Sequence, residues 1–284
     1  MTDFALVEMA QWQGSGTRTA RRLVEGAARL AELASSPCRT RVLTSDAPGR
    51  ARAGVAHADV LARNLAAARE AVADAGRDGR PVITVGGDCG IDIAPVEAAL
   101  RRYGDRLAVV WFDAHGDLNT PASSPSGAFH GMVLRTLLGE GPAALCPEVP
   151  LDAGRLVLAG VRALDPAERD HVRAQDIALV GPAALATPDA LIAAVAATGA
   201  DTVHIHIDLD VLDPAAFTSV GTPEPDGVHP DHLVAAVRAL AARFAPAGLT
   251  VTEYEAGEAS PAGDRALLRR LVPDLVAALY ADAP

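Results

Sequence analysis

Short apolar runs alternate with longer runs of helix-type composition along the whole sequence, and this alternation constrains the fold more than any other feature. The predicted strands lie at residues 4–10, 41–44, 81–85, 107–112, 155–161, 177–180, around His204 and at 249–253. The predicted helices lie at residues 17–33, 57–75, 91–103, 131–138, 166–173, 188–197, 231–243 and after Asp264. This rhythm is typical of a mainly parallel sheet with helices on both faces. The sequence therefore predicts a three-layer α/β/α fold with roughly eight strands.

Composition limits the number of domains and the classes of partner. We find no linker, low-complexity tract or internal repeat, so we expect one domain over residues 1–284. The net charge of −11 without a basic cluster disfavours nucleic acid and anionic membranes. The N-terminus has no signal-peptide pattern, no apolar run reaches membrane-spanning length, and the three cysteines are scattered. We therefore expect a cytoplasmic protein.

Candidate metal ligands follow three of the predicted strands. They are Asp88 and Cys89 after the strand at 81–85, Asp113, His115 and Asp117 after the strand at 107–112, and Asp208 and Asp210 after the strand around His204. Side chains two residues apart on a strand share a face, so we expect these groups to point the same way. Ligands of parallel sheets bind beyond the carboxyl ends of the strands, which predicts one shared site.

The chemistry of these side chains favours a pair of metal ions. Buried carboxylates without partners are costly, and divalent cations offset that cost. An oxygen-rich donor set with some imidazole suits Mn²⁺, and two ions that share carboxylates suit hydrolysis by a bridging hydroxide. The alternative for the first segment alone is a strand that runs into a polar loop, with Asp117 capping a turn.

Three segments carry a resemblance to a known family. They read GGDCG at 86–90, DAHGD at 113–117 and HIDLDVLDP at 206–214, in this order. They resemble the signature segments of the ureohydrolase (arginase/agmatinase) family, and the strand and helix rhythm matches over nearly the whole chain. The resemblance implies an arginase-like fold, two Mn²⁺ ions, cleavage of a guanidino C–N bond, and assembly into a trimer or hexamer.

The resemblance also implies a ligand set. In it Asp113 and Asp208 bridge both ions, His115 and Asp210 complete one, and Asp117 and Cys89 complete the other. The family has histidine where this chain has Cys89, reading GGDHS in place of GGDCG. Thiolate is softer than imidazole and favours softer metals over Mn²⁺, so we expect the ion on the Cys89 side to be weakly held or absent. The alternative is that Cys89 is a small buried residue, as free cysteines often are.

Further residues match family positions at the substrate. The implied catalytic residues are Asp117 as proton acceptor, His130 as proton shuttle and Glu253 as partner of the guanidinium, with Glu255 as the alternative carboxylate. The implied substrate residues are Asn119, Ser124 and Ser126 for an α-carboxylate, Asp165 and the adjacent Glu168 for an α-ammonium, and Thr222. The competing interpretations are ordinary loop serines, a helix-start histidine and solvated strand-end carboxylates. We interpret His204 and His206 as interior residues that support the ligands.

The identity of the substrate rests on the same comparison. Cys89 resembles the branch of the family that hydrolyses Nω-hydroxy-L-arginine to hydroxyurea and L-ornithine, while the Asn119 loop resembles that of arginases, which convert L-arginine to urea and L-ornithine. Ala128 departs from arginases, which have asparagine there. The alternatives are an agmatinase or guanidino-acid hydrolase, a formimidoylglutamase, and a metal-binding pseudoenzyme.

Overall fold

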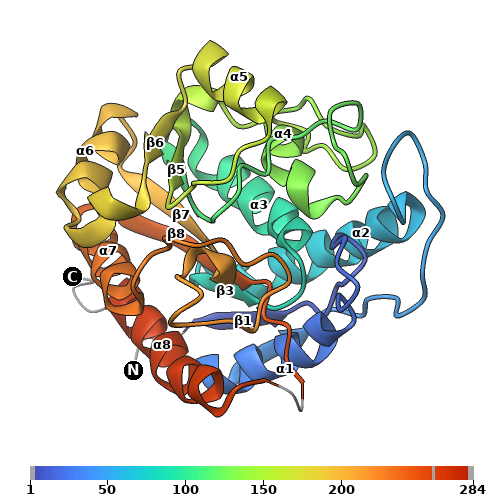
Figure 1. Cartoon of the computed structure of the whole chain (residues 1–284), viewed down its shortest axis with the longest axis horizontal. Coiled ribbons are helices and arrows are strands. Elements are labelled where there is room, and N and C mark those ends of the chain that lie inside the picture. The colour runs from blue at the N-terminus through green and yellow to red at the C-terminus, as the bar shows by residue number, and fades with distance from the viewer. Residues whose placement is uncertain (1–3, 258–259, 281–284) are drawn as a thin grey trace.

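An eight-stranded sheet forms the centre of the computed structural model, which describes residues 4–257 and 260–280 (Figure 1). The strands are β1 (Ala5–Glu8), β2 (Cys38–Arg41), β3 (Val82–Val85), β4 (Leu107–Phe112), β5 (Leu156–Ala159), β6 (Ala178–Val180), β7 (Thr202–Asp208) and β8 (Ala245–Thr252). They lie in the order β2-β1-β3-β8-β7-β4-β5-β6, and all neighbouring pairs are parallel. The predicted parallel α/β/α architecture is confirmed.

Helices cover both faces of this sheet. They are α1 (Arg22–Ala34), α2 (Ala58–Ala75), α3 (Ile93–Tyr103), α4 (Val133–Leu137), α5 (Pro166–Ala174), α6 (Asp189–Ala197), α7 (Pro230–Arg243) and α8 (Ala262–Tyr280). Helices α1, α6, α7 and α8 pack on one hydrophobic core, and α2, α3 and α4 pack on the other (Figure 1). None of the described helices has the combination of length and apolar composition needed to cross a membrane.

Strand β4 shows why helices pack on both faces of the sheet. Val110 and Phe112 enter the core beneath α6 to α8, whereas Val109 and Trp111 enter the core beneath α2 to α4. All six residues of the strand are buried. Alternating side chains on a strand that is apolar on both faces require helices on both sides.

The edge strand β2 differs from its prediction. The strand occupies Cys38–Arg41, and its last three residues are exposed. It is held by parallel pairing with β1 and by Arg39 and Arg41, whose guanidinium groups lie 2.5 and 3.3 Å from the buried Glu8 carboxylate. The prediction of residues 41–44 was wrong because this strand has no apolar run to reveal it.

Candidate metal centre

The turn after β4 brings DAHGD to the carboxyl edge of the sheet. Strand β4 ends at Phe112, and Asp113 Oδ1 then accepts a hydrogen bond of 2.7 Å from His115 N. Asp117 has a left-handed backbone with φ of 51°. The prediction that alternation along a strand aligns these residues was wrong, because a tight turn directs them instead.

The end of β7 supplies the second pair of carboxylates. Asp208 Oδ1 accepts from Asp210 N at 2.7 Å and so caps the single turn at Leu209–Val211. Asp210 Oδ1 accepts from Ala114 N at 3.1 Å, and Asp210 Oδ2 lies 3.1 Å from His115 Nδ1. Because β4 and β7 are neighbours in the sheet, these bonds join the two turns into one rim.

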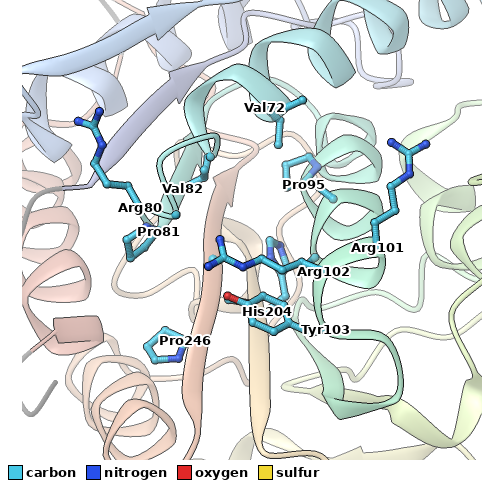
Figure 2. Close-up of a pocket in the computed structure, with 17 residues that line it drawn as sticks. Val72, Arg80, Pro81, Val82, Pro95, Arg101, Arg102, Tyr103, His204 and Pro246 are labelled. Carbon is cyan, nitrogen blue, oxygen red and sulfur yellow. The ribbon is translucent and has the colours of Figure 1, made fainter. Parts of the chain in front are cut away.

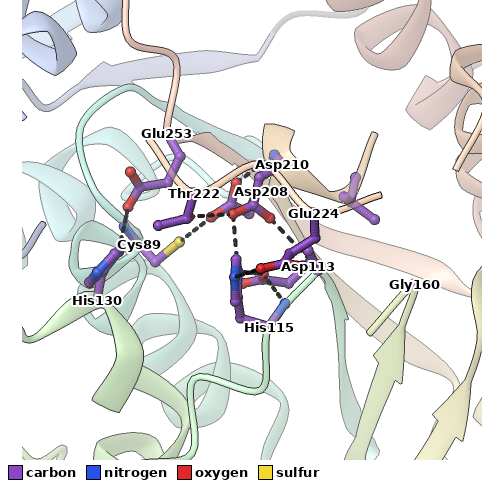
Figure 3. Close-up of polar contacts among 12 residues, drawn as sticks. Cys89, Asp113, His115, His130, Gly160, Asp208, Asp210, Thr222, Glu224 and Glu253 are labelled. Atoms are coloured by element: carbon purple, nitrogen blue, oxygen red, sulfur yellow. Dashed lines mark hydrogen bonds and ion pairs between the residues drawn. The ribbon is translucent and has the colours of Figure 1, made fainter. Parts of the chain in front are cut away.

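Strand β3 delivers Cys89 to the same rim (Figure 3). Its thiol donates to Asp208 Oδ2 at 3.1 Å, and its backbone N donates to Glu253 Oε1 at 3.1 Å. Gly87 makes the approach possible, since it has φ of 64° and a Cβ there would lie 2.6 Å from Gln11 O. Cys89 is fully enclosed, with 1% of its surface exposed.

Potential ligand atoms gather in three overlapping groups. They are Asp113 with His115 and Asp210, Cys89 with Asp208 and Glu253, and Cys89 with Asp113 and His206. The atoms in each group lie within 4.8 Å of one another. The Cys89 thiol is thus close to both Asp113 and Asp208, the residues predicted to be shared. Asp117 belongs to none of these groups, but its buried Oδ2 has no hydrogen-bond partner among the described residues.

The charged side chains at this rim favour the binding of cations. Burial and the neighbouring carboxylates raise the pKa values of Asp113, Asp117 and Asp208. Burial also raises the pKa of the Cys89 thiol. Burial alone would lower the pKa of His115, but Asp113 and Asp210 raise it to about 12. Crowded buried carboxylates, an orphaned oxygen, an imidazole and a thiol together fit two divalent cations.

A pocket of about 380 Å³ opens beside these residues. It is lined by the six predicted substrate residues, Asn119, Ser124, Ser126, Asp165, Glu168 and Thr222, and also by His115, Asp117, His130, Asp208 and Glu224. Five of the residues that line it carry carboxylates, and it contains no arginine or lysine among the residues that the structure describes. An acidic pocket of this kind favours a cationic ligand.

Hydrogen bonds hold the walls of the pocket in place. Asn119 Nδ2 donates to Asp165 Oδ2 at 2.8 Å. The Ser124 and Ser126 hydroxyls accept from backbone N–H groups at 3.0 and 3.2 Å, so their own O–H groups are available. Glu168 accepts from Leu118 N and Asp165 N, both at 2.8 Å, and completes the capping box of α5. Glu168 therefore joins the loop after β4 to the start of α5.

His130, which lines the pocket, contacts the buried Glu253 behind it (Figure 3). His130 Nδ1 lies 3.4 Å from Glu253 Oε1. Burial alone would lower the pKa of His130, but the hydrogen bond and charge of Glu253 raise it overall. The alternative carboxylate, Glu255, instead accepts a 2.6 Å hydrogen bond from Thr17 Oγ1.

Sequence reasoning missed two residues at or behind this rim, Asp92 and Glu224. Asp92 lies 2.9 Å from His204 Nε2 and 3.0 Å from His206 Nδ1, and the His206 ring stacks on Trp111 at 3.4 Å between centroids. Burial alone would raise the pKa of Asp92, but His204 and His206 lower it to about 2. Glu224 lines the pocket with its Oε1 3.9 Å from His115 Nε2. Asp92 had no sequence signal, whereas Glu224 stands in the loop that already contained Thr222.

Comparison with known proteins relates the chain to one family. The model of the Arginase family matches residues 8–277. An arginase from Bacillus caldovelox is 36% identical over 188 residues, which are 60% of this chain and 62% of that protein. An arginase from Entamoeba histolytica is 33% identical over 161 residues, which are 52% of each chain. The chain thus aligns with only about half to three fifths of these relatives.

Solved structures show the same fold. The B. caldovelox arginase structure has a TM-score of 0.85 at 24% identity and covers 100% of this chain and 99% of its own. The proclavaminate amidino hydrolase of Streptomyces clavuligerus has a TM-score of 0.73 at 19% identity, covering 99% of this chain and 92% of its own. Because the family model matches residues 8–277 of this chain, the chain belongs to the Arginase family.

Proposed function

We propose that this protein is an Mn²⁺-dependent amidinohydrolase that cleaves the guanidino C–N bond of an arginine-type substrate. The observation that carries the proposal is the pairing of two ligand groups with an acidic pocket at one rim of the sheet. Guanidinium carbon is a poor electrophile because resonance spreads its charge over three nitrogens. Bound Mn²⁺ ions would supply a nucleophile at neutral pH by lowering the pKa of water.

The side chains divide into those that hold ions and those that handle the substrate. Asp113, His115 and Asp210 would hold one ion, and Cys89 and Asp208 would hold the other. Asp117 would complete the second set, and Asp113 and Asp208 would serve both ions. The buried Oδ2 of Asp117, which lacks a partner among described residues, supports its place in this set. We expect the Cys89 side to be the weaker one because of its thiol.

Proton transfers fall to residues around the pocket. Hydrolysis adds water across the C–N bond, so the water proton must leave and the departing amine must gain one. Asp117, near Asp113, is suited to accept the first proton. His130, whose pKa Glu253 raises, is suited to protonate the amine. Glu253 would also contact the guanidinium from the side of Cys89.

The far end of the pocket would bind the amino-acid end of the substrate. The free O–H groups of Ser124 and Ser126 can donate to an α-carboxylate, and Asp165 can pair with an α-ammonium. Replacement of the family histidine by Cys89 favours Nω-hydroxy-L-arginine over L-arginine, since an N-hydroxyguanidine is less basic and more easily attacked. The expected products are hydroxyurea, or urea, together with L-ornithine.

One observation favours a second candidate, an agmatine-type substrate. Carboxylates line the pocket, with no arginine or lysine among its described residues to pair with a substrate carboxylate. Agmatine carries two cationic groups and no carboxylate, so Asp165 and Glu224 would both favour it. Ser124 and Ser126 would then have no charged partner, which is why we rank this candidate second.

A panel of guanidino compounds tests these assignments. The Mn²⁺-loaded protein would be assayed with Nω-hydroxy-L-arginine, L-arginine, agmatine, guanidinobutyrate and formimidoylglutamate, with urea, hydroxyurea and L-ornithine quantified. We expect turnover of Nω-hydroxy-L-arginine at least equal to that of L-arginine. A strong preference for plain arginine or for agmatine would reject the hydroxylated substrate. No turnover of any compound with two ions bound would identify a pseudoenzyme.

A further inference from the structure

A second pocket, of about 270 Å³, lies at the opposite edge of the sheet (Figure 2). Its walls come from the amino-terminal parts of β3 and β8, from the last turn of α2 and from one side of α3 along most of its length. Val72, Val82, Pro95 and Pro246 make these walls largely apolar. The candidate metal centre lies at the carboxyl ends of the same strands, so the two sites are separated by the length of the sheet. Nothing in the proposed hydrolysis uses this second pocket.

A histidine forms the floor of the pocket. His204 has 1% of its surface exposed, and its Nε2 lies 2.9 Å from Asp92 Oδ1. An ionised carboxylate only accepts, so Nε2 carries a hydrogen and Nδ1 is the ring nitrogen left to accept. Nδ1 has no hydrogen-bond partner among the described residues. A Cβ at Gly248 would lie 3.0 Å from Nδ1, so the glycine leaves this nitrogen open to the pocket.

A guanidinium without a carboxylate partner reaches across the same pocket. Arg102 forms no ion pair with any described residue, and its Cζ lies 5.3 Å from the centroid of the Tyr103 ring. Figure 2 shows its guanidinium and the Tyr103 oxygen on the same side of the pocket, in front of His204, whereas Arg80 and Arg101 point away. Arg101 is already paired with Glu97 and Glu148. Arg102 is therefore the positive group offered to a ligand.

We propose that this pocket binds a small organic carboxylate that carries a hydroxyl or amino hydrogen-bond donor. The carboxylate would pair with Arg102 beside the Tyr103 hydroxyl, and the donor would reach His204 Nδ1 on the floor. The body of the molecule would contact Val72, Val82 and Pro246. Apolar walls with a few placed polar groups are the usual make-up of a small-molecule site, and the volume suits a ligand smaller than a drug.

Three matched probes separate the two polar contacts. The probes are 4-hydroxybenzoate, benzoate, which lacks the donor, and 4-hydroxybenzamide, which lacks the charge. Isothermal titration of the full-length, metal-loaded protein would give the Kd of each. We expect 4-hydroxybenzoate to bind most tightly and each of the others to bind roughly tenfold more weakly, since each loses one hydrogen-bonded contact. Equal binding of all three, or no binding of 4-hydroxybenzoate at millimolar concentration, would overturn the proposal.

Variants assign the binding to this pocket and not to the metal centre. We expect Arg102→Gln to weaken 4-hydroxybenzoate binding roughly tenfold or more. Arg101→Gln is the matched control, because it removes the neighbouring charge that points away, and it should leave Kd unchanged. Gly248→Ala should weaken 4-hydroxybenzoate binding roughly tenfold by covering His204 Nδ1, with circular dichroism confirming its fold. Wild-type affinity in Arg102→Gln would refute the site even if Gly248→Ala were unfolded.

Discussion

Replacement of Arg162 should loosen the loop that carries Asp210 and the pocket residue Glu224. The five N–H groups of Arg162 lie within hydrogen-bond distance, 2.9–3.4 Å, of six backbone carbonyls, those of Gly160, Asp210, Val211, Leu212, Glu224 and Pro225, so that one N–H is shared. These carbonyls lie on the turn after β5 and on both ends of the loop between β7 and α7. One side chain thus holds together three stretches of backbone, of which only Leu209–Val211 forms a helical turn.

The size of the effect follows from these bonds. Hydrogen bonds from a charged donor contribute about 1.5–3 kcal/mol each, but the contributions do not add, and exposed carbonyls regain water. For Arg162→Met, which keeps the apolar stem, we expect a loss of about 3–5 kcal/mol of unfolding free energy. In a chain of this size the melting temperature should fall by roughly 5–8 °C. Arg162→Lys has three donors and should recover part of this loss.

Urea unfolding followed by circular dichroism would measure the change, with metal retention after gel filtration as a second measurement. Arg106→Met is the control, because its pair with Asp201 is exposed on both sides and should contribute little. We expect Arg162→Met alone to lose metal, since the backbone of Asp210 is no longer held. A loss of less than about 1 kcal/mol in Arg162→Met would refute the reasoning.

Three further predictions concern the rim and its support. Cys89→His should raise tightly held Mn²⁺ from about one to two ions per chain after dialysis, as measured by elemental analysis; two tightly held ions in the wild type would contradict this. His130→Gln should lower kcat by a factor of roughly 10²–10⁴ with little change in KM. An unchanged kcat would exclude His130 as the proton donor. The carboxyl of Asp92 has its pKa lowered from 3.8 to about 2, so it stabilises the fold above about pH 4 and this stabilisation is lost as pH falls towards 2. Relative to Asp92→Asn, the wild type should lose about 2 kcal/mol of unfolding free energy over that window. If the unfolding free energies of the two proteins changed in parallel with pH, the pKa of Asp92 would not be lowered in the folded state.

Most of the fold could be predicted from the sequence. Strand β4 is apolar on both faces, and β7 alternates Val203, Ile205 and Ile207 with polar residues. Both patterns are local properties of contiguous residues. The exception, β2, is an exposed edge strand whose position depends on pairing with β1 and on the Glu8 carboxylate. Such contacts are not encoded in the strand itself.

The candidate ligands could also be found from their motifs, but the reason for their alignment could not. We expected alternation along a strand to align Asp113, His115 and Asp117, whereas the strand ends at Phe112 and a turn with a left-handed Asp117 directs them. Turn geometry depends on bonds such as that from Ala114 N to Asp210, which is distant in the chain.

The sequence by itself determined the strand and helix rhythm, the residue types at the strand ends, and the substitution of cysteine at position 89. Only the tertiary structure decided that β3, β8, β7 and β4 are consecutive in the sheet, which places Cys89, Glu253, Asp208 and Asp113 at one rim. The same packing brought Asp92 to His204 and left Arg102 facing an apolar pocket. Periodicity is a property of neighbouring residues and can be read from the sequence. Contacts between residues that are distant in the chain depend on strand order and helix packing, which are fixed only when distant segments bury one another.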